Sequence, residues 1–225
     1  MRRKGRTNTV SQTGTGFGSR ILDFDFNVTT GWYGVDLDPA ATSRWAVDLS
    51  QDVVGDSGDA DERTELRGEL QGVRDRLVTI GDPYMRAAVL IPAGERARVR
   101  CVLAFRITEP DYGADPVRYE QELAADAGHV QPGERFDIVK TWNVPVNAGL
   151  AVGAYDLITY TDPGAEYGRT EGRTVIGVFP SGSSQIIEFV FTTAEPASFS
   201  DLVDVSMACV ATLTVTLEKE NDADA

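Results

Sequence analysis

The segment ERARVRCVLAFRIT, residues 95–108, decides the fold of this chain because its apolar and polar side chains alternate. The apolar phase consists of Ala97, Val99, Cys101, Leu103, Phe105 and Ile107, and the polar phase contains Arg96, Arg98, Arg100 and Arg106. A period of two residues is typical of a β-strand with one buried and one solvated face. The segment therefore predicts a long strand and favours a fold built of β-strands.

The same alternation recurs along most of the chain. It is present in ILDFDFNV, residues 21–28, and it holds over the apolar positions of residues 203–217. Further strands are predicted at residues 44–50, 84–91, 136–144, 152–161, 174–179 and 185–192, which are bounded by clusters of Gly, Pro, Asp and Ser. The total is about nine strands, and the last of them is expected to cross the whole domain.

Two short helices are expected between the strands. Asp115 and Pro116 form a cap followed by a first-turn proline, which predicts a helix over residues 116–127. A second helix is indicated by four apolar residues at helical spacing, which are Leu66, Leu70, Val73 and Leu77.

Many strands, few helices and no βαβ rhythm predict an all-β fold, an antiparallel two-sheet sandwich. The best fit is a single jelly roll with one or two short inserted helices, and an immunoglobulin-like sandwich is the alternative. We expect three parts: a flexible basic arm over residues 1–19, a single β-sandwich domain over 20–218, and an acidic C-terminal tail over 219–225.

Charge is distributed unevenly along the chain, whose net charge is −14. Residues 1–20 contain five basic residues and no acid, so the remainder carries a net charge of −19. The acids are mostly Asp, and Lys occurs only at positions 4, 140 and 219. Such a body repels itself in dilute salt, whereas a Debye length of about 3 Å at 1 M salt removes most of this repulsion. We therefore expect a halophilic, acidic protein; the alternative is an acidic protein from a GC-rich genome.

The chain contains no motif that predicts catalysis, a metal site or a cofactor. Its single histidine, His129, cannot build the several-histidine site of a cupin, and no G-x-S-x-G motif presents a nucleophile. Asp56, Asp59, Asp61 and Glu62 lack the calcium-loop register, so a charged loop is favoured over a cation site. We expect no enzymatic activity, no metal and no cofactor.

Cysteine content and hydropathy bear on the compartment of the protein. The two cysteines, Cys101 and Cys209, fall on the apolar phase of predicted strands, which favours buried reduced thiols over a disulfide. The chain has no run of 18 apolar residues, and no apolar segment follows its basic first residues. We expect a soluble protein that uses no ordinary export signal.

The basic arm has three interpretations. Its charges, Arg2, Arg3, Lys4 and Arg6, could bind phosphates of lipid or nucleic acid, the arm could dock on a neighbouring subunit, or it could be a disordered tail. Binding to phosphates falls steeply as salt rises, because counterion release loses its driving force. In strong salt, contact with a neighbouring subunit is at least as favoured as contact with a membrane, and we expect no specific recognition of nucleic acid.

A short arm, a β-sandwich of this size and an Asp-rich, Lys-poor body together resemble the single jelly-roll major capsid proteins of icosahedral haloarchaeal viruses that contain an internal membrane. The resemblance concerns architecture and composition, and no individual residue is carried over. It implies a structural coat protein that assembles in the host cytoplasm into the oligomeric capsomers of the virion. Its implied partners are copies of itself and a second related capsid protein, and the internal membrane is a further candidate partner through the N-terminal arm.

Exposed aromatic residues at strand ends and loops are candidate interface anchors, although packing at the rim of the core explains them equally well. They are Trp32, Tyr33, Tyr112 and Tyr167. Two other classes remain open. One is another virion component, such as a spike, tail or decoration β-sandwich. The other is a carbohydrate-binding module, for which an aromatic platform is expected, but Trp32, Trp45 and Trp142 lie in three different segments.

Overall fold

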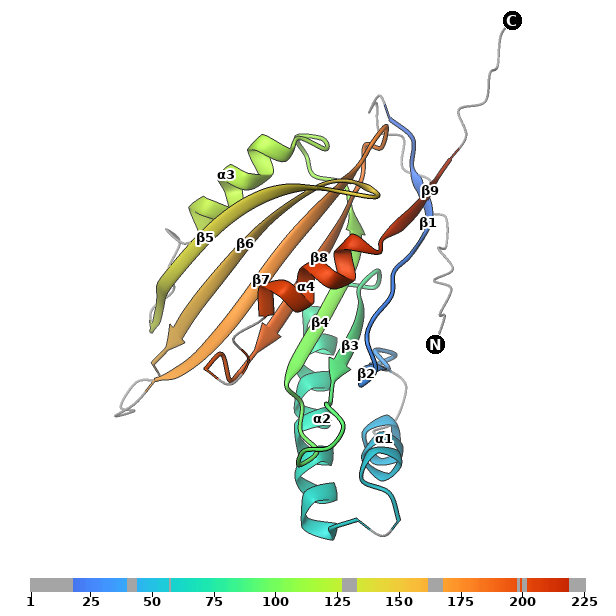
Figure 1. The fold of residues 1–225 in the computed structure, drawn as a ribbon, viewed down its shortest axis with the longest axis vertical. Coiled ribbons are helices and arrows are strands. Elements are labelled where there is room, and N and C mark those ends of the chain that lie inside the picture. The colour runs from blue at the N-terminus through green and yellow to red at the C-terminus, as the bar shows by residue number, and fades with distance from the viewer. Residues whose placement is uncertain are drawn as a thin grey trace, which may run out of the picture.

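The computed structural model describes residues 18–39, 44–56, 58–126, 133–161, 168–197, 199 and 202–218 (Figure 1). This part of the chain forms nine strands and four helices. In chain order they are β1 (Ile21–Asp25), β2 (Trp32–Gly34), α1 (Arg44–Val54), α2 (Ala60–Ile80), β3 (Arg86–Leu90), β4 (Cys101–Thr108), α3 (Pro116–Asp126), β5 (Glu134–Val146), β6 (Gly149–Tyr160), β7 (Arg169–Pro180), β8 (Ile186–Thr193), α4 (Leu202–Ala211) and β9 (Thr214–Leu217).

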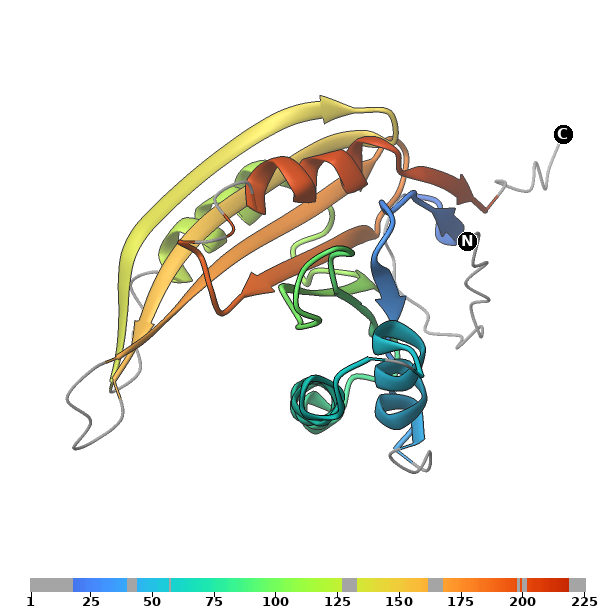
Figure 2. The ribbon, with the colours of Figure 1, turned by 60° about the horizontal axis from the view of Figure 1, so that its bottom comes forward.

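The strands form two antiparallel sheets. The large sheet has seven strands in the order β2-β3-β4-β8-β7-β6-β5, and β1 pairs with β9 in a separate two-stranded sheet. Figure 2 shows how the long strand β5 (yellow) arches over α4 (red). The predicted antiparallel β class is confirmed, and the layering of the two sheets is consistent with a β-sandwich. The strands divide seven and two, whereas the sheets of an eight-stranded jelly roll share them evenly.

One face of the large sheet, called here the α4 face, is covered by α4 and by the β1–β9 sheet. Its core contains Leu103 of β4 and Phe189 of β8, both fully buried, together with Cys209 of α4. The ring of Phe26 meets the rings of Phe105 and Phe189 edge to face, with centroids 5.1 and 5.2 Å apart. Apolar burial of this extent supplies the main driving force for folding.

The opposite face is covered by two separate helical units. The α1–α2 hairpin covers the β2–β4 end, where Leu66, Leu70, Val73 and Leu77 of α2 are buried, so the second predicted helix is confirmed. The other predicted helix is α3, which packs on the far part of the sheet through Tyr119 against Phe179 and Ile186.

Two predicted strands are helical in the structure. Residues 44–50 belong to α1, in which Ala46 and Leu49 face the core three residues apart. Most of the predicted strand 203–217 is α4, which buries Leu202, Ser206, Cys209 and Val210 before the short strand β9 begins. In both segments the buried residues follow a helical spacing, so packing on the sheet overrides the alternation of apolar residues in the sequence.

The segment that suggested a β fold becomes a strand only at Cys101. The arginines that precede it are held by carboxylates: Nη1 of Arg98 and Nη1 of Arg100 each lie 2.6 Å from an oxygen of Glu195. Arg100 also pairs with Glu95 at 2.6 Å. These ion pairs fix residues 95–100 as a loop beside the sheet.

Among the helices in the described ranges, none combines the length and the apolar character that a membrane crossing requires.

Candidate functional site

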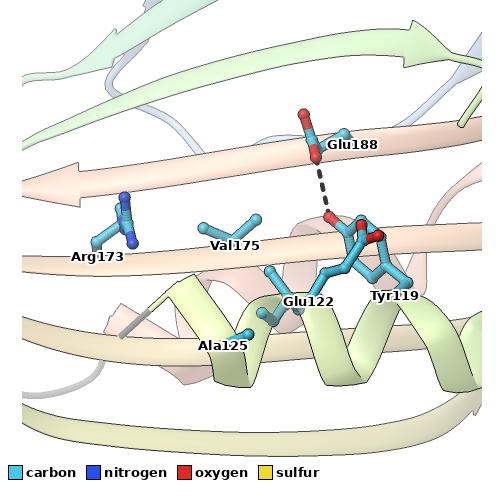
Figure 3. Close-up of a pocket in the computed structure, with 7 residues that line it drawn as sticks. Tyr119, Glu122, Ala125, Arg173, Val175 and Glu188 are labelled. Atoms are coloured by element: carbon cyan, nitrogen blue, oxygen red, sulfur yellow. Dashed lines mark hydrogen bonds between the residues drawn. The ribbon is translucent and has the colours of Figure 1, made fainter. Parts of the chain in front are cut away.

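A hollow of about 320 Å³ lies on the sheet between α3 and strands β7 and β8 (Figure 3). We call it the α3 hollow. It is lined by Tyr119, Glu122, Leu123, Ala125, Arg173, Val175 and Glu188. The side chains from the helix form its wall, and those from the two strands form its floor.

Tyr119 shapes one end of the α3 hollow. Its ring packs directly on Gly177 of β7, where an added Cβ would lie 2.7 Å from ring atom Cε1. Its phenol donates a hydrogen bond of 3.0 Å to Oε1 of Glu188. Burial, and then the nearby carboxylate of Glu188, raise the pKa of Tyr119 well above its ordinary value of 10.0, so the phenol stays a neutral donor.

The start of α3 explains why Tyr119 is held there. Oδ1 of Asp115 accepts a hydrogen bond of 2.9 Å from the backbone N–H of Val117, which caps the first turn of the helix. The N–H of Tyr119 itself bonds to the backbone oxygen of Asp115 at 3.1 Å. The predicted Asp-Pro start therefore places the first wall residue of the hollow.

Glu188 belongs to a chain of charges that crosses the sheet. Its Oε2 accepts hydrogen bonds from Nε of Arg106 at 3.0 Å and from Nη2 at 2.8 Å. Nη1 of Arg106 binds Asp82, beyond the end of α2, at 2.9 Å. Burial raises the pKa of Asp82, but the hydrogen bond and charge of Arg106 and the backbone N–H groups outweigh this, and the pKa is lowered. The chain Tyr119–Glu188–Arg106–Asp82 therefore links α3 to the end of α2.

Arg173 forms the other end of the hollow. Its Nε and Nη2 donate to Oδ2 of Asp156 at 2.9 and 2.6 Å, and Asp156 is only 3% exposed. The guanidinium lies 5.8 Å from the ring centroid of Phe136. Gly177 pairs with Glu188 across the strands, so Arg173 and Glu188 lie about 13 Å apart along the sheet.

The charged side chains of the hollow already have partners. Its volume is at the lower end of the range of ligand pockets, roughly 300–1,000 Å³. Glu188 is held by Arg106 and Tyr119, and Oε1 of Glu122 lies 3.8 Å from Nε of Arg118, so both carboxylates already have partners in the same chain. Within the described ranges, no group of three or more His, Cys, Asp and Glu side chains could hold a metal ion.

The three predicted interface anchors that the structure describes are not brought together. Trp32 packs against the core on the α4 face, whereas its neighbour Tyr33 packs on the opposite face against the α1–α2 cluster. Tyr112 lies beside the α3 hollow, with the guanidinium of Arg118 4.5 Å from its ring centroid. Tyr167 lies outside the described residues.

The tryptophans also form no platform for sugar binding. Trp45 packs with the α1–α2 cluster and donates from Nε1 to the backbone oxygen of Gly34 at 2.9 Å. Trp142 packs on Gly153 in the sheet, and Trp32 meets the ring of Phe191 edge to face. All three indoles therefore serve the interior of the fold.

The other residues singled out in the sequence either form hydrogen bonds that stabilise the fold or lie outside the described residues. Oδ1 of Asp59 accepts from the N–H of Asp61 at 2.8 Å and caps α2, and a carboxylate oxygen of Glu62 accepts from the N–H of Ala97. His129, the arm residues Arg2, Arg3, Lys4 and Arg6, and the tail 219–225 lie outside the described residues.

Both cysteines are buried free thiols, as predicted. Cys101 is in β4, but Cys209 is in α4 and not in a strand. Burial raises the pKa of Cys101 to about 12 and that of Cys209 to about 11, so neither is a reactive thiolate near neutral pH.

Strand β5 is a feature whose role the sequence did not reveal. It is 13 residues long and forms the outer edge of the large sheet, and within the described part of the chain its one partner strand is β6. The opposite edge, β2, has only three residues. An unpaired edge exposes a row of N–H and C=O groups that can bind another strand. The alternation of residues 136–144 predicted the strand but carried no information about its place in the sheet.

No family model matches this chain, and no curated protein matches it. Among solved structures, it is similar to LpqN of Mycobacterium tuberculosis, which is described as involved in cell envelope biogenesis; the identity is 12%, the TM-score is 0.45, and the match covers 90% of this chain and 87% of that one. It is also similar to PsbP of Synechocystis (15% identity, TM-score 0.40, 92% and 98% covered). A third is PA94 of Pseudomonas aeruginosa, a protein of unknown function (15% identity, TM-score 0.38, 56% and 81% covered). Similarities this distant carry no argument about function.

Proposed function

We propose that this protein is a structural component that works by assembling with other protein subunits. The observation that carries the proposal is the edge of β5, a strand of 13 residues that is paired on one side only among the residues that the structure describes. Natural sheets usually protect such edges by making them short, as β2 is here. A long edge left open is a surface on which a partner strand can add.

The contacts in the α3 hollow also support this proposal. Its carboxylates and Arg173 are engaged with partners from the same chain, so their hydrogen bonds stabilise the fold. A catalytic or ligand-binding site normally directs a few polar groups toward the bound molecule. A role in assembly needs no such groups.

The more specific form of the proposal is a major capsid protein of a virion that assembles in strong salt. Its support comes from the sequence: an acidic, Asp-rich and Lys-poor body, a basic arm, and a predominantly antiparallel β fold. In this form the partners are further copies and a second related coat protein, and a membrane is a further candidate partner for the arm. Another virion component is the alternative within the same class.

Sedimentation velocity and negative-stain electron microscopy at rising KCl concentration test the proposal. We expect oligomers, including closed rings, to become more abundant between about 0.1 and 2 M salt, where the Debye length falls from about 10 Å to below about 3 Å. A protein that remains monomeric at every salt concentration contradicts an assembly role. Specific binding to a glycan array by that monomer favours a carbohydrate-binding module instead.

A further inference from the structure

The hairpin that joins β5 to β6 determines which backbone groups of β5 point outward. Val146 pairs with Gly149 around the two-residue turn 147–148, and such a turn closes on a hydrogen-bonded pair. Hydrogen-bonded and non-hydrogen-bonded pairs alternate from there in an antiparallel ladder. Residues 144, 142 and 140 therefore bond to β6, while Val139, Thr141 and Asn143 direct their N–H and C=O groups away from the sheet.

The open part of this edge is limited at both ends. Pro145 is the next outward position toward the turn, and it has no N–H to donate. In the other direction the register shifts between Phe136 and Ile138, so Asp137 interrupts the ladder. Within the described ranges, no backbone hydrogen bond from outside the sheet reaches Val139, Thr141 or Asn143. The usable edge runs from 138 to 144 and is centred on Thr141.

We infer that β5 pairs with β5 of a second copy of this chain, antiparallel, about a two-fold axis at Thr141. This inference rests on the proposed function and specifies one of its contacts. In this register Thr141 lies opposite Thr141 of the second copy, and Val139 lies opposite Asn143 of the second copy. Each of these pairs can exchange two hydrogen bonds. Two seven-stranded sheets become one continuous sheet.

The positions of the two interruptions identify a second copy as the partner. Pro145 is four residues after Thr141 and Asp137 is four residues before it. About the same axis, Pro145 of one copy therefore lies opposite Asp137 of the other, and both ends of the ladder stop together. Pairing with an unrelated strand would not explain why Pro145 and Asp137 are equally far from Thr141. A self-complementary edge is what an isologous two-fold contact requires.

Charge at the edge also permits self-pairing. Lys140 is the only charged residue between 138 and 144, in a chain whose net charge is −14. The axis places Lys140 opposite Trp142 of the second copy, a combination of cation and indole ring, and no like charges face each other directly. α3 packs on one face of the sheet against β6 and β5, where Nδ2 of Asn143 donates a hydrogen bond of 3.3 Å to Oε2 of Glu120; this contact occupies the side chain of Asn143 and not its backbone N–H or C=O (Figure 3).

Thr141→Pro tests the inference, because it removes an outward N–H and leaves the bonds to β6 in place. Light scattering coupled to gel filtration should find a dimer for the wild type and a monomer for Thr141→Pro. The control Thr141→Val keeps the backbone donor and should remain dimeric, and circular dichroism verifies that each variant is folded. A folded Thr141→Pro variant that dimerises like the wild type overturns the inference.

Cysteine cross-linking tests the register independently of folding stability. Directly paired residues have Cα atoms about 5.5 Å apart, which suits a disulfide. Thr141→Cys should form a covalent dimer under mild oxidation. The control Thr79→Cys, exposed on α2, should not form one. Equal cross-linking of both variants overturns the register.

The two proposals can fail separately. If larger assemblies persist in a folded Thr141→Pro variant, the β5 contact is wrong and the assembly function stands. If the wild type forms the cross-linkable dimer and nothing larger at any salt concentration, the β5 contact stands and the structural role in a larger assembly is wrong.

Discussion

The contact between Gly177 and Tyr119 makes a strong prediction about the α3 hollow. In Gly177→Ala the new Cβ would lie 2.7 Å from Cε1, 2.8 Å from Cζ and 3.2 Å from Cδ1 of the Tyr119 ring. The ring cannot move away freely, because Tyr119 is only 6% exposed. Its ring centroid lies 5.5 Å from that of Phe179, and its phenol is hydrogen-bonded to Glu188. The substitution therefore forces the ring off the sheet.

The cost has two parts. Overpacking a well-filled site costs about 1–3 kcal/mol, and the displaced phenol loses its hydrogen bond to Glu188, which adds about 1 kcal/mol. We expect Gly177→Ala to lower the free energy of unfolding by about 2–4 kcal/mol in a urea titration. The control Gly68→Ala, whose Cβ would meet nothing within 4 Å, should stabilise α2 by about 1 kcal/mol.

A double-mutant cycle identifies the ring as the cause. Tyr119→Ala alone removes a buried aromatic side chain and should cost about 3 kcal/mol or more. In that background Gly177→Ala meets no ring, so its additional cost should fall to near zero. If Gly177→Ala is harmless in the wild type, or equally costly with and without Tyr119, the ring does not depend on this glycine and the account of the hollow is wrong.

Three further predictions concern buried polar groups. Arg173→Met leaves the carboxylate of Asp156 without a principal partner and should cost about 3 kcal/mol of unfolding free energy; adding Asp156→Asn should recover part of this, and no recovery contradicts the pairing. The raised pKa of Tyr119 means that its neutral form stabilises the fold fully below its ordinary pKa of 10.0 and that this contribution is lost at higher pH. Tyr119→Phe should therefore lose less stability than the wild type when urea titrations are repeated in alkali, and parallel losses refute the assignment. Cys101 and Cys209 should react with a thiol reagent near neutral pH only after unfolding, and rapid labelling of the native protein contradicts their burial.

The sequence predicted the elements that carry unambiguous local signals. The start of α3 follows from Asp115 and Pro116, and the buried stripe of α2 follows from the spacing of four apolar residues. The prediction from sequence was wrong where the same residues fit both the two-residue period of a strand and the period of a helix. In α4 the apolar residues 203, 205, 207 and 209 alternate like a strand, yet the buried set includes Leu202 and Ser206, one helical turn apart. Packing against the sheet decides between these possibilities, and packing depends on distant segments.

The candidate site was less predictable than the fold for the same reason. Tyr119 falls within the predicted helix 116–127, but its partner Glu188 is 69 residues away. The partners Arg173 and Asp156 are 17 residues apart and meet because β6 and β7 are adjacent. The position of β5 at the edge depends on the order of all seven strands. Such contacts between distant residues are set by topology, and one sequence carries little local trace of them.

Salt concentration affects both the proposed contact through β5 and the binding of the basic arm. Two bodies with a net charge of −14 each repel one another in dilute salt, so contact is least costly where charge is lowest, and residues 138–144 contain only Lys140. Screening removes this repulsion but leaves backbone hydrogen bonds nearly unchanged, so pairing through β5 should strengthen as salt rises. Binding of the basic arm to phosphates should weaken over the same range, because counterion release loses its driving force. The two contacts therefore respond to salt with opposite signs, and the solvent that disfavours the arm as an electrostatic anchor is the one that favours assembly through the sheet.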